Sequence, residues 1–402
     1  MDLILLAVPF FFLLIGIELI AEKVRGTNYY RLNDSITSLT TGTLSQLLKV
    51  VQLMVPFTIY VMVFQHFSLF SLGDSALVWI VAFVLYDFSY YWLHRFGHEV
   101  NILWAAHVVH HSSEEYNLTT ALRQTGTSAL SFLFFLPLAI LGFEPLMLAT
   151  VGALNLIYQY WVHTQHIGKL GWYEKYFVTP SNHRGHHAQN AVYIDRNYGG
   201  VFIIWDRLFG SYQEELDDDL PIYGIRGALN SWNPLWANMQ VYKQLIDDCR
   251  HSKNWWHKLT LWFRRTGWRP PDVVQQYPLN KTDLSDFTKF DTVLNAATKV
   301  YAVIAYVFNA GVALALVMNS QLLTPLQQLL IIVFILISTF LTGAMLEARA
   351  FAPKLELIKY TGFVVLSVIA LPINALSIGG ITLALACIFA ISLSSPMSIK
   401  AV

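Results

Sequence analysis

The feature that most constrains this chain is a series of long apolar runs. The runs occupy residues 3–21, 44–65, 75–93, 127–141, 146–165, 293–317, 328–346, 359–373 and 379–394. A helix that crosses a bilayer needs about 20 mostly apolar residues, and most of these runs approach that length. Only 13% of the residues are charged, whereas soluble globular proteins carry about 25%. The runs therefore predict an all-α integral membrane protein, a multi-span bundle of about 7–9 hydrophobic helices.

The number of spans depends on one short run. Residues 127–141 are joined to the run at 146–165 only by GFEP (142–145). The pair could therefore cross the membrane twice or form a re-entrant hairpin. Either arrangement leaves its two ends on the same side, so the rest of the topology does not depend on the choice.

The distribution of lysine and arginine predicts the orientation. The connections 66–74, 142–145, 318–327 and 374–378 contain neither residue, while the opposite set includes the long polar segment 167–290, which is rich in both. Basic connections face the cytoplasm, so the polar segment and the histidine clusters beside it are expected on the cytoplasmic face. The segment is also rich in tryptophan, which suits interfacial helices in the headgroup region. A separate soluble domain with an aromatic core is the alternative.

These patterns suggest three parts. We expect N-terminal membrane helices in 1–74, a histidine-rich core with a cytoplasmic cap in 75–290, and C-terminal membrane helices in 291–402.

The net charge is +0, so no basic field exists to hold nucleic acid. The only cysteines, Cys249 and Cys387, are too few for a disulfide framework or an iron–sulfur cluster. The oligomeric state is not predicted.

Ten of the 13 histidines fall into four clusters with helical spacing. The clusters are His94/His98, His107/His110/His111, His163/His166 and His183/His186/His187. Residues spaced three or four apart lie on one face of a helix, so we expect the imidazoles of each cluster to converge on one point. Each cluster lies at or just beyond the cytoplasmic end of an apolar run. Helix packing could therefore bring all four together.

So many imidazoles predict two metal ions. Zinc sites are normally four-coordinate, and ten ligands are too many for one ion. Imidazole binds zinc, copper, iron and nickel alike, so the ligands alone do not choose the metal. A buried pair of metals at the bilayer edge, in a chain without a hydrolase nucleophile motif, favours redox-active iron and dioxygen. A structural metal site is the alternative, although such sites are closed and have few ligands.

The order His-x-x-x-His, His-x-x-His-His and a second His-x-x-His-His resembles the fatty acid hydroxylase/sterol desaturase superfamily of membrane di-iron oxygenases. TPSNHRGHH (179–187) and NYGGVFIIWDRLFGSY (197–212) add to this resemblance, which covers roughly residues 30–270. Within the superfamily, DFSYYWLHRFGHEVNILWAAHVVHHSSEEYNLTTALRQ (87–124), WVHT (161–164) and the extra hydrophobic helices after residue 290 are most similar to the alkylglycerol monooxygenases.

The resemblance implies roles for particular residues. It implies eight iron ligands, His94, His98, His107, His110, His111, His183, His186 and His187, with His163 as a ninth. His166 departs from the pattern and is expected to be either a ligand or a residue that supports one. Glu99 matches an acidic residue associated with tetrahydrobiopterin, which would serve as external reductant. A solvated carboxylate at a helix end is the other interpretation of Glu99.

Asp87 is a candidate that the residues themselves indicate. It lies two helical turns before His94 inside an apolar run, and carboxylates in such positions are costly and usually functional. We expect it to orient a ligand imidazole through the ring N–H. Asn155 is a weaker candidate of the same kind, for which core packing is the alternative. Asp195 and Asp206 flank the NYGG turn and are expected to fix that loop.

Three functions compete on these grounds. The first is a di-iron, dioxygen-dependent monooxygenase that hydroxylates the ether-linked alkyl carbon of an alkylglycerol. The second is another lipid hydroxylase or desaturase of the superfamily, acting on a sterol, a fatty acyl chain or an amino lipid. Electrons must come from a partner, either a reduced pterin or a small redox protein. The third is a histidine-rich metal transporter, although transporters place their ligands near the bilayer midplane.

Overall fold

The computed structural model describes residues 3–52, 54–128, 130–370 and 375–393. The regular elements of the described residues are all helices, with three isolated β-bridges and no strand among those residues. The predicted all-α fold is thereby confirmed. Positions 53 and 129, inside two of the apolar runs, lie outside the described residues, as do 371–374 and 394 at the ends of two others.

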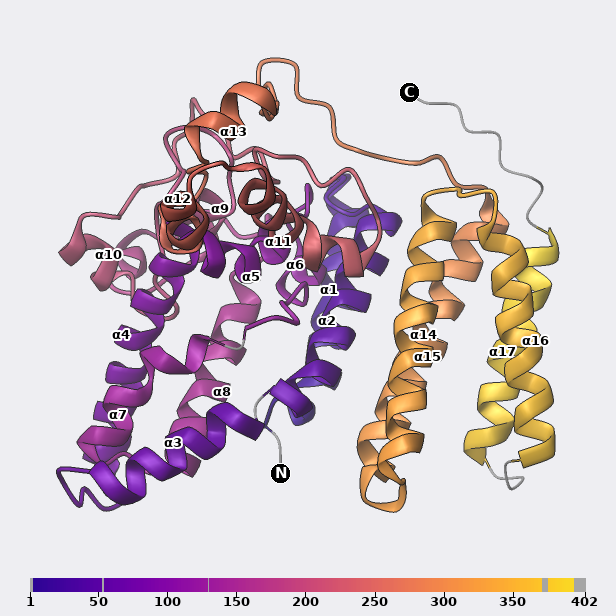
Figure 1. Cartoon of the computed structure of the whole chain (residues 1–402), viewed down its shortest axis with the longest axis horizontal. Coiled ribbons are helices and arrows are strands. Elements are labelled where there is room, and N and C mark those ends of the chain that lie inside the picture. Colours follow the sequence, from indigo (N-terminus) through magenta and orange to yellow (C-terminus); the bar gives the residue numbers. More distant parts are fainter. Residues whose placement is uncertain (1–2, 53, 129, 371–374, 394–402) are drawn as a thin grey trace. The chain divides into compact units, whose positions relative to one another are not determined.

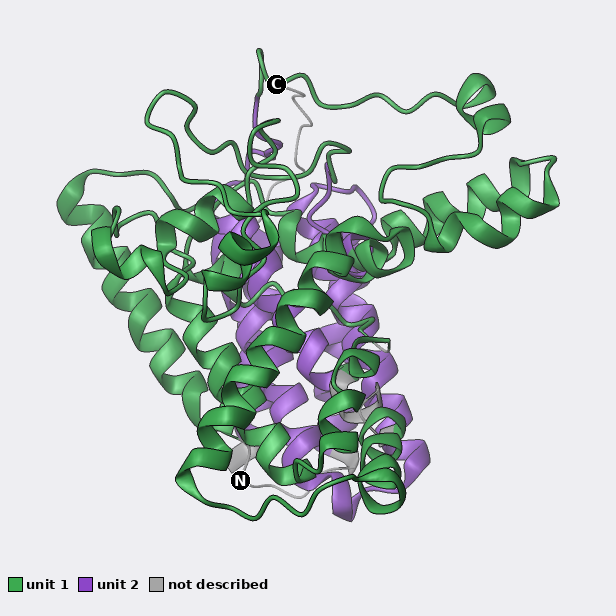
Figure 2. Ribbon diagram, turned by 90° about the vertical axis from the view of Figure 1, so that its left-hand side faces the viewer, with its two compact units in different colours: residues 1–30, 48–229, 238–287 green, residues 31–47, 230–237, 288–402 purple. Residues whose placement is uncertain are grey.

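The chain forms two compact units (Figure 2). The first comprises residues 1–30, 48–229 and 238–287, and the second comprises 31–47, 230–237 and 288–402. The helices that lie wholly in the first unit are α1 (Leu3–Arg25), α3 (Met54–Phe67), α4 (Ala76–Glu99), α5 (Asn101–His111), α6 (Leu118–Ala121), η1 (Ser131–Phe134), α7 (Leu136–Leu141), α8 (Pro145–Trp161), η2 (Gly171–Lys175), α9 (Pro180–His186), α10 (Ile204–Phe209), α12 (Trp255–Thr260), η3 (Leu261–Phe263) and α13 (Pro271–Gln276).

The second unit is built from the C-terminal helices. These are α14 (Ala296–Asn319), η4 (Ser320–Leu322), α15 (Pro325–Leu346), α16 (Ala352–Ala370) and α17 (Ala375–Leu393). Asn295 caps α14, and Thr324 forms a capping box with Gln327 at the start of α15. Their buried core includes Tyr301, Phe308 and Met345. Two further helices, α2 (Leu32–Gln52) and α11 (Pro234–His251), begin in residues of the second unit and end in the first.

Three helices are long and apolar enough to cross a membrane. They cover Ala76–Glu99, Ala296–Leu322 and Pro325–Leu346, and Val55–Phe67, Ser131–Leu141 and Ile378–Leu393 form shorter apolar helices. The run at 127–141 does not form one long helix, since the short elements η1 and α7 divide it. Membrane-spanning character is thus supported for these three helices, and the larger number of spans stays a prediction.

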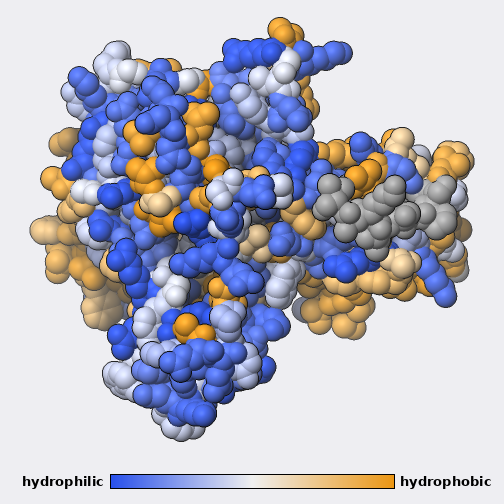
Figure 3. Space-filling model, turned by 90° about the horizontal axis from the view of Figure 1, so that it is seen from above, coloured by the Kyte–Doolittle hydropathy of each residue, from blue (hydrophilic) through white to orange (hydrophobic). Residues whose placement is uncertain are grey.

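Within the first unit, α4 packs against α5 and α8. The arrangement is visible in Figure 1, where α4 rises to α5 and the polar segment with α9, α12 and α13 lies at that same end. Seen from above, much of this face is hydrophilic, with hydrophobic residues at its margins and in smaller patches between the polar ones (Figure 3). The packing of α4, α5 and α8 brings the histidine clusters to one end of the unit.

Candidate metal centre

Nine of the ten predicted histidines lie in two groups. The five-histidine group contains His94, His98, His107, His111 and His186, and the four-histidine group contains His110, His163, His183 and His187. Within each group one ring nitrogen of every member lies within 4.8 Å of the others. All are buried except His107, which is partly exposed. The expected convergence of the clusters is therefore present in the fold.

The grouping corrects one expectation from the sequence. The two His-x-x-His-His triplets do not each converge on one point. His107 and His111 join one group while His110 joins the other, and His186 is separated from His183 and His187 in the same way. Successive residues are rotated by about 100° around a helix, so the two adjacent histidines of each triplet point in different directions. Each triplet therefore contributes to both groups.

Local structure positions the histidine-bearing elements α4, α5 and α9. Both His94 and His98 lie in the last turns of α4, and α5 begins after the single residue Val100. A bridge pairs Val100 with Arg265. The helix α9 starts at a capping box in which Thr179 and Asn182 bond each other's backbone, with Pro180 in the first turn. The short connection at Val100 thus sets where α4 ends and α5 begins, and the capping box sets where α9 begins.

Backbone carbonyls fix the orientation of four imidazoles. The Nδ1 atoms of His94, His110, His163 and His186 lie 2.8, 3.0, 2.8 and 2.8 Å from the carbonyl oxygens of Tyr198, Arg123, Gln159 and Arg196. A carbonyl oxygen only accepts, so Nδ1 carries the hydrogen in each neutral ring and Nε2 carries the lone pair. This is the usual way in which a protein prepares histidine to bind a metal.

The prepared nitrogens need a cation. In the four-histidine group the Nε2 atoms of His110 and His163 lie 3.3 Å apart, although neither carries a hydrogen. Two facing lone pairs repel each other unless a cation lies between them. In addition, the Nε2 atoms of His98, His186 and His187 are buried and have no hydrogen-bond partner among the described residues, which is costly for a polar atom. The residues present therefore fit bound metal ions.

Burial keeps the imidazoles neutral. It lowers the pKa of His110 to about 4. Burial and neighbouring imidazoles also hold the pKa well below its ordinary value in His107, His111, His183, His186 and His187. Removal from water disfavours the charged form of a base. The rings are thus unprotonated near neutral pH, the form that binds metals.

Comparison with known proteins gives the family. A sequence model described as fatty acid hydroxylase matches residues 79–211, which include all nine grouped histidines. The alkylglycerol monooxygenase of Homo sapiens is 33% identical over 370 residues, which cover 91% of this chain and 82% of that protein. The chain belongs to the fatty acid hydroxylase family.

Other relatives agree with this assignment. The alkylglycerol monooxygenase of Danio rerio is 33% identical over 88% of this chain and 79% of its own length. An ornithine lipid hydroxylase of Rhizobium tropici is 27% identical over only 37% of the chain. No solved structure matches significantly. The predicted membership of the fatty acid hydroxylase family is confirmed, and with it the prediction that the chain is an oxidoreductase rather than a transporter.

In this member of the fatty acid hydroxylase family, Asp87 is bonded differently from our expectation. Its carboxylate accepts hydrogen bonds from the amides of Val201 and Phe202 at 2.8 and 3.0 Å, and from the side chains of Asn155 and Trp205 at 2.7 and 2.9 Å. None of these donors is an imidazole. Asp87 therefore ties α4 to α8 and to the loop after Tyr198, whose carbonyl orients His94.

Asp206 fixes the same loop, as predicted. It accepts hydrogen bonds from the amides of Tyr198 and Gly199 and from the Ser211 hydroxyl, each at 2.7 Å. Burial raises its pKa to about 6. The second flanking residue, Asp195, has a left-handed backbone (φ 59°) and pairs with Arg265 at 3.2 Å. The NYGG loop thus rests on two buried carboxylates, Asp87 and Asp206.

His166 and Glu99 lie outside the two groups. Both ring nitrogens of His166 are buried without a hydrogen-bond partner among the described residues, and its ring lies 5.1 Å from that of Tyr29. The Glu99 carboxylate pairs with Arg95 at 3.0 Å and its side chain is 28% exposed. A ligand role for His166 and a pterin role for Glu99 stay predictions.

Sequence reasoning missed three neighbours of the groups. The Trp104 indole lies against His98 and His111, with ring centroids 5.1 and 5.7 Å away. Glu18 and Arg184 hold the segment that follows His163. Glu18 could have been noticed, because it is the one charged residue in the apolar run 3–21. Arg184 stands between His183 and His186, but nothing in the sequence gives its partners.

Proposed function

We propose that this chain is an integral membrane di-iron monooxygenase that hydroxylates the ether-linked alkyl carbon of alkylglycerols. The observation that carries the proposal is the pair of groups that nine imidazoles form, eight of them buried. Relatives named alkylglycerol monooxygenase that align over most of the chain indicate the substrate class.

The two groups would hold one iron each. His94, His98, His107, His111 and His186 would bind the first, and His110, His163, His183 and His187 the second. When bound, the iron pair would supply the redox chemistry that activates dioxygen for insertion of one oxygen atom into a C–H bond. His166 has no place in either group, and we propose that it supports the site rather than binds iron.

The protein itself supplies orientation and exclusion of water. Four backbone carbonyls hold the imidazoles with Nε2 directed to the metal. Burial keeps the ligands neutral and limits the access of solvent. Hydroxylation of the carbon next to the ether oxygen gives a hemiacetal, which collapses to a fatty aldehyde and glycerol. Dioxygen and two electrons with two protons balance this step, and the second oxygen atom leaves as water.

The electrons would come from reduced tetrahydrobiopterin. Glu99 supports this proposal, because it lies next to the ligand His98 in sequence and its carboxylate is partly exposed. A carboxylate can accept hydrogen bonds from the amino group and ring N–H of a pterin. A small redox protein is the alternative donor. If Glu99 binds the pterin, Glu99→Gln should lose the turnover that reduced pterin supports. It should keep the turnover that a chemical reductant supports.

For the membrane arrangement we propose about 7–9 hydrophobic helices, with the three parts 1–74, 75–290 and 291–402. The histidine-rich cap faces the cytoplasm. On α12, Trp255 and Trp256 are 74% and 63% exposed, and the Lys258 ammonium lies 4.9 Å from the Trp255 ring. Exposed tryptophan beside lysine is typical of a helix at the headgroup level.

Thiol labelling tests the orientation. After replacement of Cys249 and Cys387 by serine, Ser71→Cys and Ser285→Cys each carry a single exposed thiol. An impermeant maleimide should label Ser71→Cys in intact cells and Ser285→Cys only after the membrane is opened. The reverse pattern would place the cap on the other side.

An oxygenation assay tests the proposed reaction. Purified, iron-loaded protein is incubated with an alkylglycerol, a reduced pterin and ¹⁸O₂. We expect fatty aldehyde that carries one ¹⁸O when it is trapped by reduction to the alcohol. The matched acylglycerol, in which an ester replaces the ether, should give none. Turnover of a sterol, a fatty acyl chain or an amino lipid without ether cleavage would instead support the second function.

A further inference from the structure

The segment that carries His163 needs outside support. His163 lies two residues beyond the end of α8 at Trp161, whereas the other three members of its group lie in α5 or in α9 and its C-cap. Its Nε2 atom is nevertheless 3.1 Å from that of His183. The Gln159 carbonyl in α8 orients the ring through Nδ1, and how residues 162–167 are held sets how closely the ring approaches His183.

Thr164, the next residue, is held from two sides. Its hydroxyl donates a hydrogen bond to the carboxylate of Glu18 on α1. Its carbonyl oxygen accepts a hydrogen bond of 3.0 Å from the guanidinium of Arg184 on α9. Thr164, Glu18 and Arg184 are 5%, 5% and 8% exposed, so both contacts are shielded from water and from competing partners.

Both carboxylate oxygens of Glu18 accept hydrogen bonds. The one that does not contact Thr164 accepts hydrogen bonds from the Tyr30 hydroxyl and, at 2.9 Å, from the amide of Leu118. A carboxylate inside an apolar helix is expensive unless it is used. Here it joins α1 to the segment after α8 and to the start of α6. α1 lies outside residues 79–211 that match the family model.

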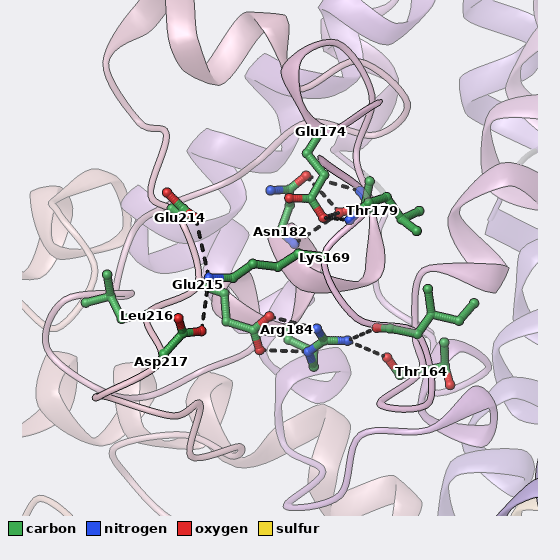
Figure 4. A network of polar contacts seen from close by, with 12 residues as sticks. Thr164, Lys169, Glu174, Thr179, Asn182, Arg184, Glu214, Glu215, Leu216 and Asp217 are labelled. Carbon is green, nitrogen blue, oxygen red and sulfur yellow. Dashed lines mark hydrogen bonds and ion pairs between the residues drawn. The ribbon is translucent and has the colours of Figure 1, made fainter. Parts of the chain in front are cut away.

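Arg184 makes the second contact with Thr164, at its carbonyl oxygen (Figure 4). It stands between the ligands His183 and His186 and donates two hydrogen bonds to Glu215, at 2.8 and 2.7 Å. Its remaining contacts are to the carbonyls of Thr164 and, at 2.7 Å, Ile167. A planar guanidinium bound to a carboxylate at two points is a rigid support.

We infer that Glu18 and Arg184 form a two-sided clamp on Thr164 that positions His163 in the four-histidine group. Both are positioning residues, and through Glu18 the first helix becomes part of the metal centre. The inference rests on the proposed two-metal site. It does not depend on the lipid that is oxidised.

Metal retention tests the clamp. Glu18→Gln keeps the size of the side chain but removes its charge and replaces one of its two acceptor oxygens by a donor NH₂ group. Because loss of a group that orients a ligand typically weakens metal binding about 10–100-fold, we expect the chelator concentration that removes one of two irons to fall by about that factor. The second iron, in the five-histidine group, should be retained as in the wild type. Mössbauer spectra of ⁵⁷Fe-loaded protein should lose the signal of a coupled pair.

Matched variants separate positioning from folding. Glu22→Gln changes the carboxylate one turn further along α1, which accepts a hydrogen bond from the Tyr29 amide at 3.1 Å and does not contact Thr164; it should retain both irons. Thr164→Val removes the hydroxyl, which also accepts a hydrogen bond of 3.1 Å from the His166 amide, and should reproduce the loss. Thr164→Ser should restore retention. Should Glu18→Gln not accumulate in membranes, the two Thr164 variants decide.

The outcomes are distinct. Wild-type iron retention and an unchanged Mössbauer spectrum in both Glu18→Gln and Thr164→Val would overturn the clamp. A wild-type protein that binds fewer than two irons would overturn the metal centre and the clamp with it. Two irons in the wild type and loss of one of them in the variants, in a protein that cleaves no ether lipid, would support the clamp and overturn only the proposed substrate.

Discussion

The His110→Ala/His186→Ala variant should form no detectable fatty aldehyde from an alkylglycerol. The two substitutions remove one ligand from each group, so neither metal keeps its full set. The rate of aldehyde formation should fall by more than about 100-fold, which is the upper range of the loss when a group that only orients a ligand is removed. The measurement is the initial rate of aldehyde formation with reduced pterin and dioxygen, at equal amounts of folded protein.

The chain offers a matched control for this variant. His66 and His251 are exposed and lie outside both groups. The His66→Ala/His251→Ala variant removes the same number of imidazoles and should keep the wild-type rate. Equal losses in the two double variants would mean that the grouped histidines have no special role in turnover.

The Asp87→Ala variant should be strongly destabilised. Its carboxylate is fully buried and accepts four hydrogen bonds. A buried donor without a partner costs about 1–3 kcal/mol, so several unpaired donors consume much of a net stability of about 5–15 kcal/mol. The expected result is a markedly lower melting temperature in detergent, together with loss of activity, because the loop that orients His94 is released.

Asp74→Ala is the control for Asp87. Asp74 is an exposed carboxylate just before α4, and its removal should leave the melting temperature near that of the wild type. If Asp87→Ala melted at the wild-type temperature, Asp87 could not be an anchor between α4 and the NYGG loop. Wild-type stability with lost activity would instead favour a direct role in the reaction.

Helical periodicity made the histidine site predictable, but only up to a point. Spacings of three and four residues indicated which imidazoles share a helix face, and their number indicated two metals. The spacing gives His110 a different direction from His111, but it could not show how the histidines divide between the two groups. That division depends on the direction from which α8 and α9 approach α5, which is a property of tertiary packing.

The supporting residues were harder to predict because their partners are distant in sequence. Asp87 was noticed as a carboxylate in an apolar run, yet its partners at 155, 201, 202 and 205 follow from helix packing. Glu18 bonds a residue 146 positions away, and no local pattern indicates such a pairing. In contrast, Thr179 and Pro180 mark the start of α9 within the sequence itself.

Metal analysis of the purified protein is the most direct test of the proposed di-iron centre. After loading with ferrous iron and removal of loosely bound metal, we predict two irons per chain in the wild type and a large loss of both in the His110→Ala/His186→Ala variant. Full two-metal occupancy in that variant, or fewer than two irons in the folded wild type, would contradict the account.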